Sequence, residues 1–479
     1  MTFGRRRHGT SLPRHDTKQG GPHVRGLRRE LGIWETAALS IAIMAPTAAM
    51  ALNGSLAASI AGTAVPLSFL GALITIALVS YSFVEFSRQY AHAGSVYAFN
   101  GIALGPHFGF LSGWALLFTY IAFTGASMAE VGAFFQTFLA LLGVQIPWLL
   151  PALVAGVLIW LLAFRDVRLS TRVTMVFEGV SIVLILVLAA IILARGGAHG
   201  LTLRPFAIGK NGLSAVALAS VFGFLSFAGF EGAATLGEET ANPRRLIPRA
   251  LFFAVFLTGA FYLLISYTQS EGFGLGAAGV KAFATSSAPL GDLARTYVGA
   301  GMAAVIMLGA TISAFSSALG TATAGSRILF AMGRDGFISR SLGTAHPRNQ
   351  TPYMALAVVM VIAFAVNIVL VSQPGTSVFG YLGTIGVLSL LLVYFATQIS
   401  AMRLFGKLGR WRGPQFAIPV VAILLLAYTL WSNVYPVPAA PYNYFPYLVV
   451  LWILAGVVVV LARPQVVRSL GEQFARQEF

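Results

Sequence analysis

Residues 40–50 read Ser-Ile-Ala-Ile-Met-Ala-Pro-Thr-Ala-Ala-Met, an apolar run with a proline near its centre. Pro46 lacks a backbone donor and clashes with the preceding turn, so the sequence predicts a helix that is interrupted there. A second run, residues 222–232, reads Phe-Gly-Phe-Leu-Ser-Phe-Ala-Gly-Phe-Glu-Gly. Its glycines and Glu231 make its middle flexible and polar. The simpler interpretation of the two runs is one proline kink and one small-residue packing face.

The composition around these runs is that of a membrane protein. The chain has 479 residues, of which 57% are hydrophobic and 10% charged, and its mean hydropathy is +0.81. A soluble protein would carry about 25% charged residues. The net charge of +16 invites a nucleic-acid-binding interpretation, but the apolar runs are long enough to span a membrane. They are continuous rather than alternating, which disfavours a β-barrel. The absence of cysteine excludes disulfides, thiolate metal sites and cysteine catalysis.

Charges, prolines and glycine clusters divide the chain into apolar segments of roughly 20 residues, the length of a transmembrane helix. The predicted segments are 34–60, 66–90, 108–137, 147–164, 172–194, 213–237, 248–269, 296–327, 352–372, 377–402, 417–435 and 443–462. The expected fold class is therefore an all-α polytopic membrane protein with twelve transmembrane helices. The glycine-rich loop at 270–295 is a candidate for a surface helix.

The basic residues predict the orientation of these helices. Of the 31 lysines and arginines, all but Arg195, Arg204, Lys210, Lys281 and Arg295 fall on one predicted side. The positive-inside rule then puts both termini in the cytoplasm, with the chain in the plasma membrane. We expect a disordered basic tail at 1–30, a transporter domain at 31–465 and a short cytoplasmic tail at 466–479.

Four carboxylates fall within the predicted spans: Glu85, Glu130, Glu178 and Glu231. An ionisable group inside a membrane is costly to bury, so each is a functional candidate. No His-Glu-x-x-His motif and no convincing embedded Ser-His pair is present, which argues against an intramembrane enzyme. Neither repeated motifs nor charged rings indicate a channel. Two interrupted helices five spans apart are instead typical of an inverted-repeat transporter.

Several motifs carry a family resemblance. They are Tyr81-Ser-Phe-Val-Glu-Phe-Ser-Arg-Gln-Tyr90 with Ala93-Gly-Ser-Val-Tyr-Ala-Phe99, Gly105-Pro-His-Phe-Gly-Phe-Leu-Ser-Gly-Trp114, Phe227-Ala-Gly-Phe-Glu231 with Glu238-Glu-Thr-Ala-Asn-Pro-Arg-Arg-Leu-Ile-Pro248, and Arg327-Ile-Leu-Phe-Ala-Met-Gly-Arg-Asp-Gly336. In this order they resemble the amino acid–polyamine–organocation (APC) superfamily over roughly residues 30–465. The resemblance implies a LeuT-like fold with inverted repeats at about 34–194 and 213–402, plus peripheral helices at 417–462. It also implies secondary active transport of amino acids or related amines, inward or by exchange, through alternating access.

The resemblance places the substrate at the two helix breaks. Family members hold an amino acid's carboxylate on backbone amides of the first break, which maps to Met44, Ala45, Pro46, Thr47 and Ala48. Many relatives have a glycine-rich run there, and Pro46 cannot donate. The substrate's ammonium would meet the second break, at Leu225, Ser226, Phe227, Ala228, Gly229 and Phe230, of which Phe227 and Phe230 are the aromatic candidates for a lid over the site.

Ion coupling is expected at Glu231 first and Glu178 second. Several proton-coupled relatives place a lysine near the position of Ser181, and this chain has none in any predicted helix. Hydroxyl groups of Ser313, Ser316 and Ser317 lie near the position of a sodium site in other relatives, although a small-residue packing face explains these serines equally well. H⁺ is the expected coupling ion, because Glu231 is a titratable group beside a predicted break, and Na⁺ is the alternative, because the lysine is missing and these serines are present. A cytoplasmic gate is predicted from Glu85, Arg88, Glu238 and Glu239, with static ion pairs as the alternative.

The expected partners are a small-molecule amino acid or amine and the lipid bilayer, without a cofactor, a metal site or nucleic acid. A monomer or weak homo-oligomer is expected. The open alternatives are a Na⁺-coupled amino acid symporter, an amino acid/polyamine exchanger, and a channel or sensor on a transporter-like scaffold.

Overall fold

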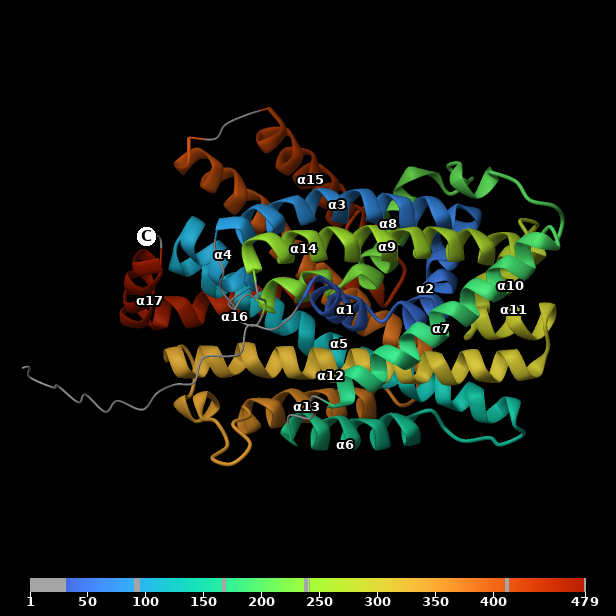
Figure 1. Ribbon diagram of the computed structural model, residues 1–479, viewed down its shortest axis with the longest axis horizontal. Helices are drawn as coiled ribbons and strands as arrows, with labels where there is room; N and C mark the ends of the chain where they lie inside the picture. Colours follow the sequence, from blue (N-terminus) through green and yellow to red (C-terminus); the bar gives the residue numbers. More distant parts are fainter. Residues whose placement is uncertain are drawn as a thin grey trace, which may run out of the picture.

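A computed structural model of the chain describes residues 32–89, 95–165, 169–236, 240, 242–409 and 413–477. The regular structure of these residues is helical (Figure 1). The elements are α1 (Ile33–Met44), α2 (Pro46–Ala61), η1 (Gly62–Ala64), α3 (Val65–Gln89), α4 (Ser95–Leu104), α5 (Pro106–Leu141), α6 (Leu149–Arg165), α7 (Leu169–Ala194), η2 (Arg204–Phe206), α8 (Gly212–Phe227), η3 (Phe230–Leu236), α9 (Pro243–Phe273), α10 (Ala277–Thr285), α11 (Pro289–Tyr297), α12 (Ala300–Asp335), η4 (Arg340–Gly343), α13 (Tyr353–Val369), α14 (Gly375–Lys407), α15 (Gly413–Ser432), η5 (Tyr442–Tyr444), α16 (Phe445–Ala462) and α17 (Pro464–Gln477).

Every predicted apolar segment coincides with one or two of these helices. Within the described residues, nine helical stretches are long and apolar enough to cross a membrane, and α6 and α13 are shorter apolar helices. One of the nine, Pro46–Gln89, contains parts of two predicted spans. The chain is thus a multi-pass membrane protein, while the number of crossings and the inverted repeat stay predictions.

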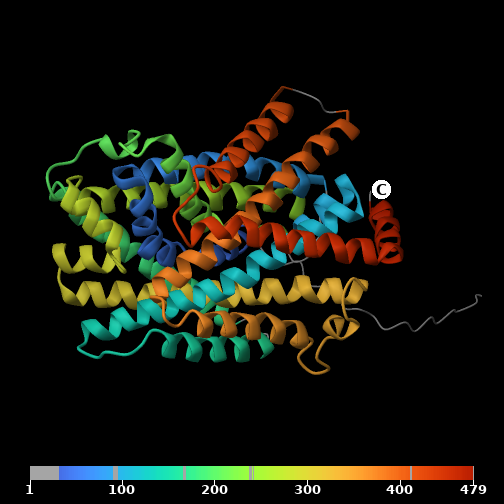
Figure 2. The same cartoon turned by 180° about the vertical axis from the view of Figure 1, so that it is seen from behind.

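The long helices run side by side along one axis of the molecule (Figures 1 and 2). The most extensive packing joins α5 to α12 and α14. Helices α15 and α16 are the least buried of the candidate spans, with 28% and 22% of their apolar windows buried. They therefore lie at the periphery of the bundle, where their apolar side chains can face lipid.

Short helices occupy the two ends of the bundle. Helices α4 and α17 lie at one end, and α10 and α11 lie at the other (Figures 1 and 2). The loop expected at 270–295 thus contains α10 and most of α11. The segment expected as a C-terminal tail is largely helical, as α17, and the basic tail at 1–30 lies outside the described residues.

Both predicted helix breaks are present. The first separates α1 from α2 at Ala45, a left-handed residue with φ 46° and ψ 61°, and Pro46 begins α2. The second separates α8 from η3 at Ala228 and Gly229, and Gly229 has φ 101°. A side chain is strained at such a φ, and a Cβ on Gly229 would also lie 2.3 Å from Cγ2 of Ile43. Ile43, which lies two residues before the first break, therefore packs against the second break.

Close packing of α8 on α3 gives a test of the fold. A Cβ added to Gly223 would lie 2.6 Å from Cβ of Ala72, whereas one added to Gly71 meets nothing within 4 Å. Overpacking of this kind costs about 1–3 kcal/mol, while a helical glycine-to-alanine change gains up to about 1 kcal/mol. Gly223→Ala should therefore lower the melting temperature in detergent, and the control Gly71→Ala should leave it equal or raise it. Equal melting temperatures for the two variants would contradict this packing of α8 on α3.

Candidate functional site

The first break frees backbone amides at the N-terminus of α2, and protein side chains accept both of those that follow Pro46. The amide of Thr47 donates to Oε1 of Glu178 at 2.8 Å. The next amide, of Ala48, donates to Oγ of Ser313 at 3.2 Å, and the Ser313 hydroxyl also lies beside the Glu178 carboxylate. A carboxylate at a helix N-terminus is stabilised by the helix dipole. Glu178 of α7 and Ser313 of α12 thus cap α2.

The second break is held by Ser40 of α1, which is fully buried. Its Oγ donates to the carbonyl of Phe230 at 2.8 Å and accepts the amide of Ala233 at 2.8 Å. One hydroxyl therefore satisfies a donor and an acceptor that regular helix would have paired internally. This contact joins the two interrupted helices to each other.

The carbonyl side of the second break is also paired. The hydroxyl of Tyr262 donates to the carbonyl oxygen of Ser226 at 2.7 Å, and the carbonyl of Leu225 accepts the amide of Ala228 at 3.3 Å. The Ser226 hydroxyl accepts Nδ2 of Asn53 at 2.7 Å. Asn53 of α2 therefore contacts the last turn of α8 beside the break.

A cavity of about 40 Å³, counted as the space open to the centre of a water molecule, lies between the two breaks. Its lining residues come from α1, α2, α5, α8, α12 and α14, with Ala45 and Ala228 from the breaks themselves. They are Ile43, Met44, Ala45, Ala48, Ala49, Asn53, Phe123, Ala126, Ser127, Glu130, Leu225, Ala228, Ser317, Thr321 and Phe379. Among the substrate contacts predicted from the resemblance, Met44, Ala45, Ala48, Leu225 and Ala228 line this cavity.

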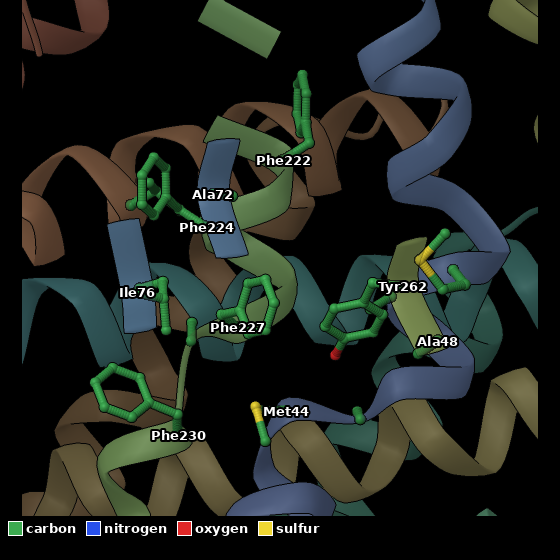
Figure 3. Close-up of a cluster of buried hydrophobic side chains, with 14 of the residues drawn as sticks. Met44, Ala48, Ala72, Ile76, Phe222, Phe224, Phe227, Phe230 and Tyr262 are labelled. Atoms are coloured by element: carbon green, nitrogen blue, oxygen red, sulfur yellow. The ribbon is translucent and has the colours of Figure 1, made fainter. Parts of the chain in front are cut away.

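The remaining predicted contacts lie beside the cavity rather than on its wall. Pro46 and Thr47 are buried at the start of α2. The rings of Phe227 and Phe230 pack into the hydrophobic core near Ala72 and Ile76 (Figure 3). Phe227 is edge-on to Tyr262, with ring centroids 5.0 Å apart. The aromatic rings on the cavity wall are those of Phe123 and Phe379, and they were not anticipated, because nothing in their local sequence distinguishes them from core residues.

Glu231 lies in the first turn of η3, two residues after Gly229, and does not line the cavity. Its Oε2 accepts the hydroxyl of Tyr394 at 3.0 Å. The Tyr120 hydroxyl and the Gly229 amide face the same carboxylate, while Oε1 is buried without a hydrogen-bond partner of normal geometry. Glu231 therefore joins η3 to α14. The sequence did not point to either tyrosine.

The serines predicted as coupling residues are dispersed. Ser181 donates to the carbonyl of Phe177 within α7, at 2.8 Å, and packs closely against Gly309 of α12. Ser317 lines the cavity and accepts the Ser127 hydroxyl at 3.3 Å, and Ser316 is half-buried on α12. Ser313 is the one of the four that reaches the first break.

Of the predicted cytoplasmic gate, Glu85 and Arg88 form an ion pair within one helix, α3. Half of the Arg88 side chain is exposed, so the pair contributes at most about 1 kcal/mol. Glu238 and Glu239 lie outside the described residues. A contact between two helices near this end is made by Tyr97 of α4, whose hydroxyl donates to Oδ2 of Asp335 on α12 at 3.1 Å. Burial, together with the Asp335 carboxylate, raises the pKa of the Tyr97 hydroxyl above its ordinary value.

Comparison with known protein families shows which class of protein this chain belongs to. The family model described as Amino acid permease matches residues 37–470, which include both breaks and the cavity. The chain belongs to the amino acid permease family. This permease is a transporter and not an enzyme, and the resemblance to the APC superfamily is confirmed.

Curated relatives of the permease are similar over most of their length. A branched-chain amino acid permease of Bacillus subtilis is 27% identical, over 69% of this chain and 72% of its own. A methylthioribose transporter of the same organism is 27% identical, over 91% of this chain and 93% of its own. A low-affinity putrescine importer of Escherichia coli is 26% identical, over 74% of this chain and 78% of its own.

The link between the two breaks can be tested at Ser40. Ser40→Ala removes the partner of the buried Ala233 amide and of the Phe230 carbonyl, and an unsatisfied buried group costs about 1–3 kcal/mol. We expect the permease variant to unfold at a lower temperature in detergent. Ser59→Ala is the control, because Ser59 is exposed and bonds only the Leu56 carbonyl of its own helix. If the two variants unfold at the same temperature, Ser40 does not hold the second break.

Proposed function

We propose that this permease is a proton-coupled secondary transporter of amino acids or related amines in the plasma membrane, with both termini in the cytoplasm. The transported class follows from the family and from relatives named for branched-chain amino acids and putrescine. The transported molecule binds at the cavity between the two breaks, where apolar side chains surround a few polar groups, the kind of lining that small-molecule sites have.

The observation that carries the proton coupling is the contact of the Glu178 carboxylate with the Thr47 amide, at 2.8 Å. Glu178 lies on α7, Thr47 begins α2, and Ser313 beside them lies on α12. An ionised carboxylate accepts a strong hydrogen bond from the amide and is favoured by the dipole of α2. Protonation weakens both interactions. Protonation of Glu178 therefore weakens the contact between α2 and α7.

Glu231 is the second coupling candidate. It is buried, its carboxylate joins η3 to Tyr394 of α14, and Oε1 lacks a partner of normal geometry. A buried carboxylate of this kind can exchange a proton when its surroundings rearrange. It ranks after Glu178 because its carboxylate bonds the Tyr394 side chain, whereas Glu178 accepts a backbone amide of the first break itself.

Transport by the purified permease in liposomes tests this function. A labelled amino acid or amine should accumulate when the interior is alkaline, and accumulation should cease when the pH gradient is dissipated. Replacement of Na⁺ by choline at fixed pH separates the two coupling ions. Unchanged uptake in choline supports H⁺, and loss of uptake in choline contradicts it in favour of Na⁺. Leak that does not saturate would favour a channel.

Glu178→Gln tests the coupling residue. The glutamine oxygen can still accept the Thr47 amide but cannot exchange a proton at neutral pH. We expect gradient-driven accumulation to fall at least tenfold while exchange of internal for external substrate persists. The control is Glu271→Gln, because Glu271 is equally buried but bonds Thr202 at the end of α9. Accumulation retained by Glu178→Gln and lost by Glu231→Gln would assign the proton to Glu231.

A further inference from the structure

The cavity between the breaks contains two buried hydrogen-bond acceptors without a partner. One is Oε1 of Glu130 on α5, and the other is Oδ1 of Asn53 on α2. Glu130 is 2% exposed and Asn53 is 1% exposed. Buried polar atoms in native proteins are nearly always paired, so two unpaired acceptors on the same cavity wall indicate a missing donor.

The only charge-bearing side chain among the described residues of the cavity lining is acidic. Glu130 is an acidic residue, and no lysine, arginine or histidine occurs among the described residues that line the cavity. An ionised carboxylate buried without a partner is costly, and a cation with hydrogen-bond donors offsets that cost. A protonated amine supplies both, because an ammonium carries one positive charge and up to three donors.

The groups that would receive a substrate carboxylate are engaged by the protein itself. Pro46 has no backbone N–H, and the amides of Thr47 and Ala48 donate to Glu178 and Ser313. The amide of Ala49 donates to the carbonyl of Ala45 at 2.9 Å. Glu178 thus places a carboxylate of the protein on the Thr47 amide of α2, within the segment to which the resemblance assigns the substrate carboxylate.

The rest of the wall suits the hydrocarbon part of an amine. Met44, Leu225, Phe123 and Phe379 supply apolar surface, and an aromatic ring near an ammonium contributes a favourable cation–π interaction. The hydroxyl groups of Ser127 and Thr321 lie on the same wall and already bond to Ser317 and Thr124.

We propose that the cavity binds the ammonium group of an amine that carries no carboxylate, with Glu130 as its counterion and Asn53 as a second acceptor. This inference rests on the proposed transport function and narrows its substrate class. Glu178 acts as the built-in carboxylate on the Thr47 amide of α2, and the ligand supplies only the cation.

Pairs of compounds that differ by one carboxylate test the proposal. The probes are isoamylamine with leucine, phenethylamine with phenylalanine, and putrescine with ornithine. Purified wild-type permease in liposomes, without any ion gradient, is loaded with one unlabelled compound and given the same compound labelled outside. We expect the amine of at least one pair to exchange with at least tenfold higher apparent affinity than its amino acid.

Variants of Glu130 separate binding from folding. Glu130→Gln should abolish amine exchange, and Glu130→Asp, which keeps the charge, should retain a measurable part of it. The control Glu271→Gln should exchange like the wild type. Amine-dependent increase of the melting temperature gives a second readout, because a ligand that binds the folded state stabilises it. This increase should be present in the wild type and absent in Glu130→Gln.

The contradicting outcomes are distinct. Exchange of the amino acids with affinity equal to or higher than that of their amines would overturn the inference and leave the proposed transport intact. Amine exchange by Glu130→Gln at the wild-type level would also overturn it. Failure of every probe to exchange in the wild type would contradict both the inference and the proposed function.

Discussion

Backbone amides and carbonyls that leave a helix inside a bilayer need partners within the protein, since lipid offers none. The permease meets this constraint at two places with few side chains. Glu178 and Ser313 accept the amides at the start of α2, and Ser40 pairs with a carbonyl and an amide at the start of η3. The cavity, its acceptors and the proposed coupling all depend on these contacts, because they fix the positions of the two breaks that border the cavity.

The breaks themselves could be predicted from local sequence. Pro46 cannot continue a helix, and Gly229 adopts a φ of 101° that other residues avoid. The apolar segments could also be predicted, because continuous hydrophobic runs of this length are typical of transmembrane helices. Family motifs gave the class of protein, which the match over residues 37–470 confirms.

The partners of the breaks could not be predicted in the same way. Thr47 and Glu178 are far apart in the sequence, as are Glu231 and Tyr394, and their pairing depends on how α2, α7, η3 and α14 pack. Sequence reasoning identified Glu178 and Glu231 as costly buried groups but ranked Glu231 first, because it lies beside a break. We propose the opposite order, since Glu178 bonds to the N-terminus of α2 and Glu231 bonds to the side chain of Tyr394.

We propose that protonation of Glu178 weakens the contact between α7 and α2, on which proton coupling depends. The most direct measurement is the pH-induced infrared difference spectrum of the permease in lipid, recorded for the wild type and for Glu178→Gln. We expect a carboxyl C=O band that appears on acidification of the wild type and is missing from the variant. An identical carboxyl band in both proteins would contradict this proposal, because Glu178 would then take no part in the titration.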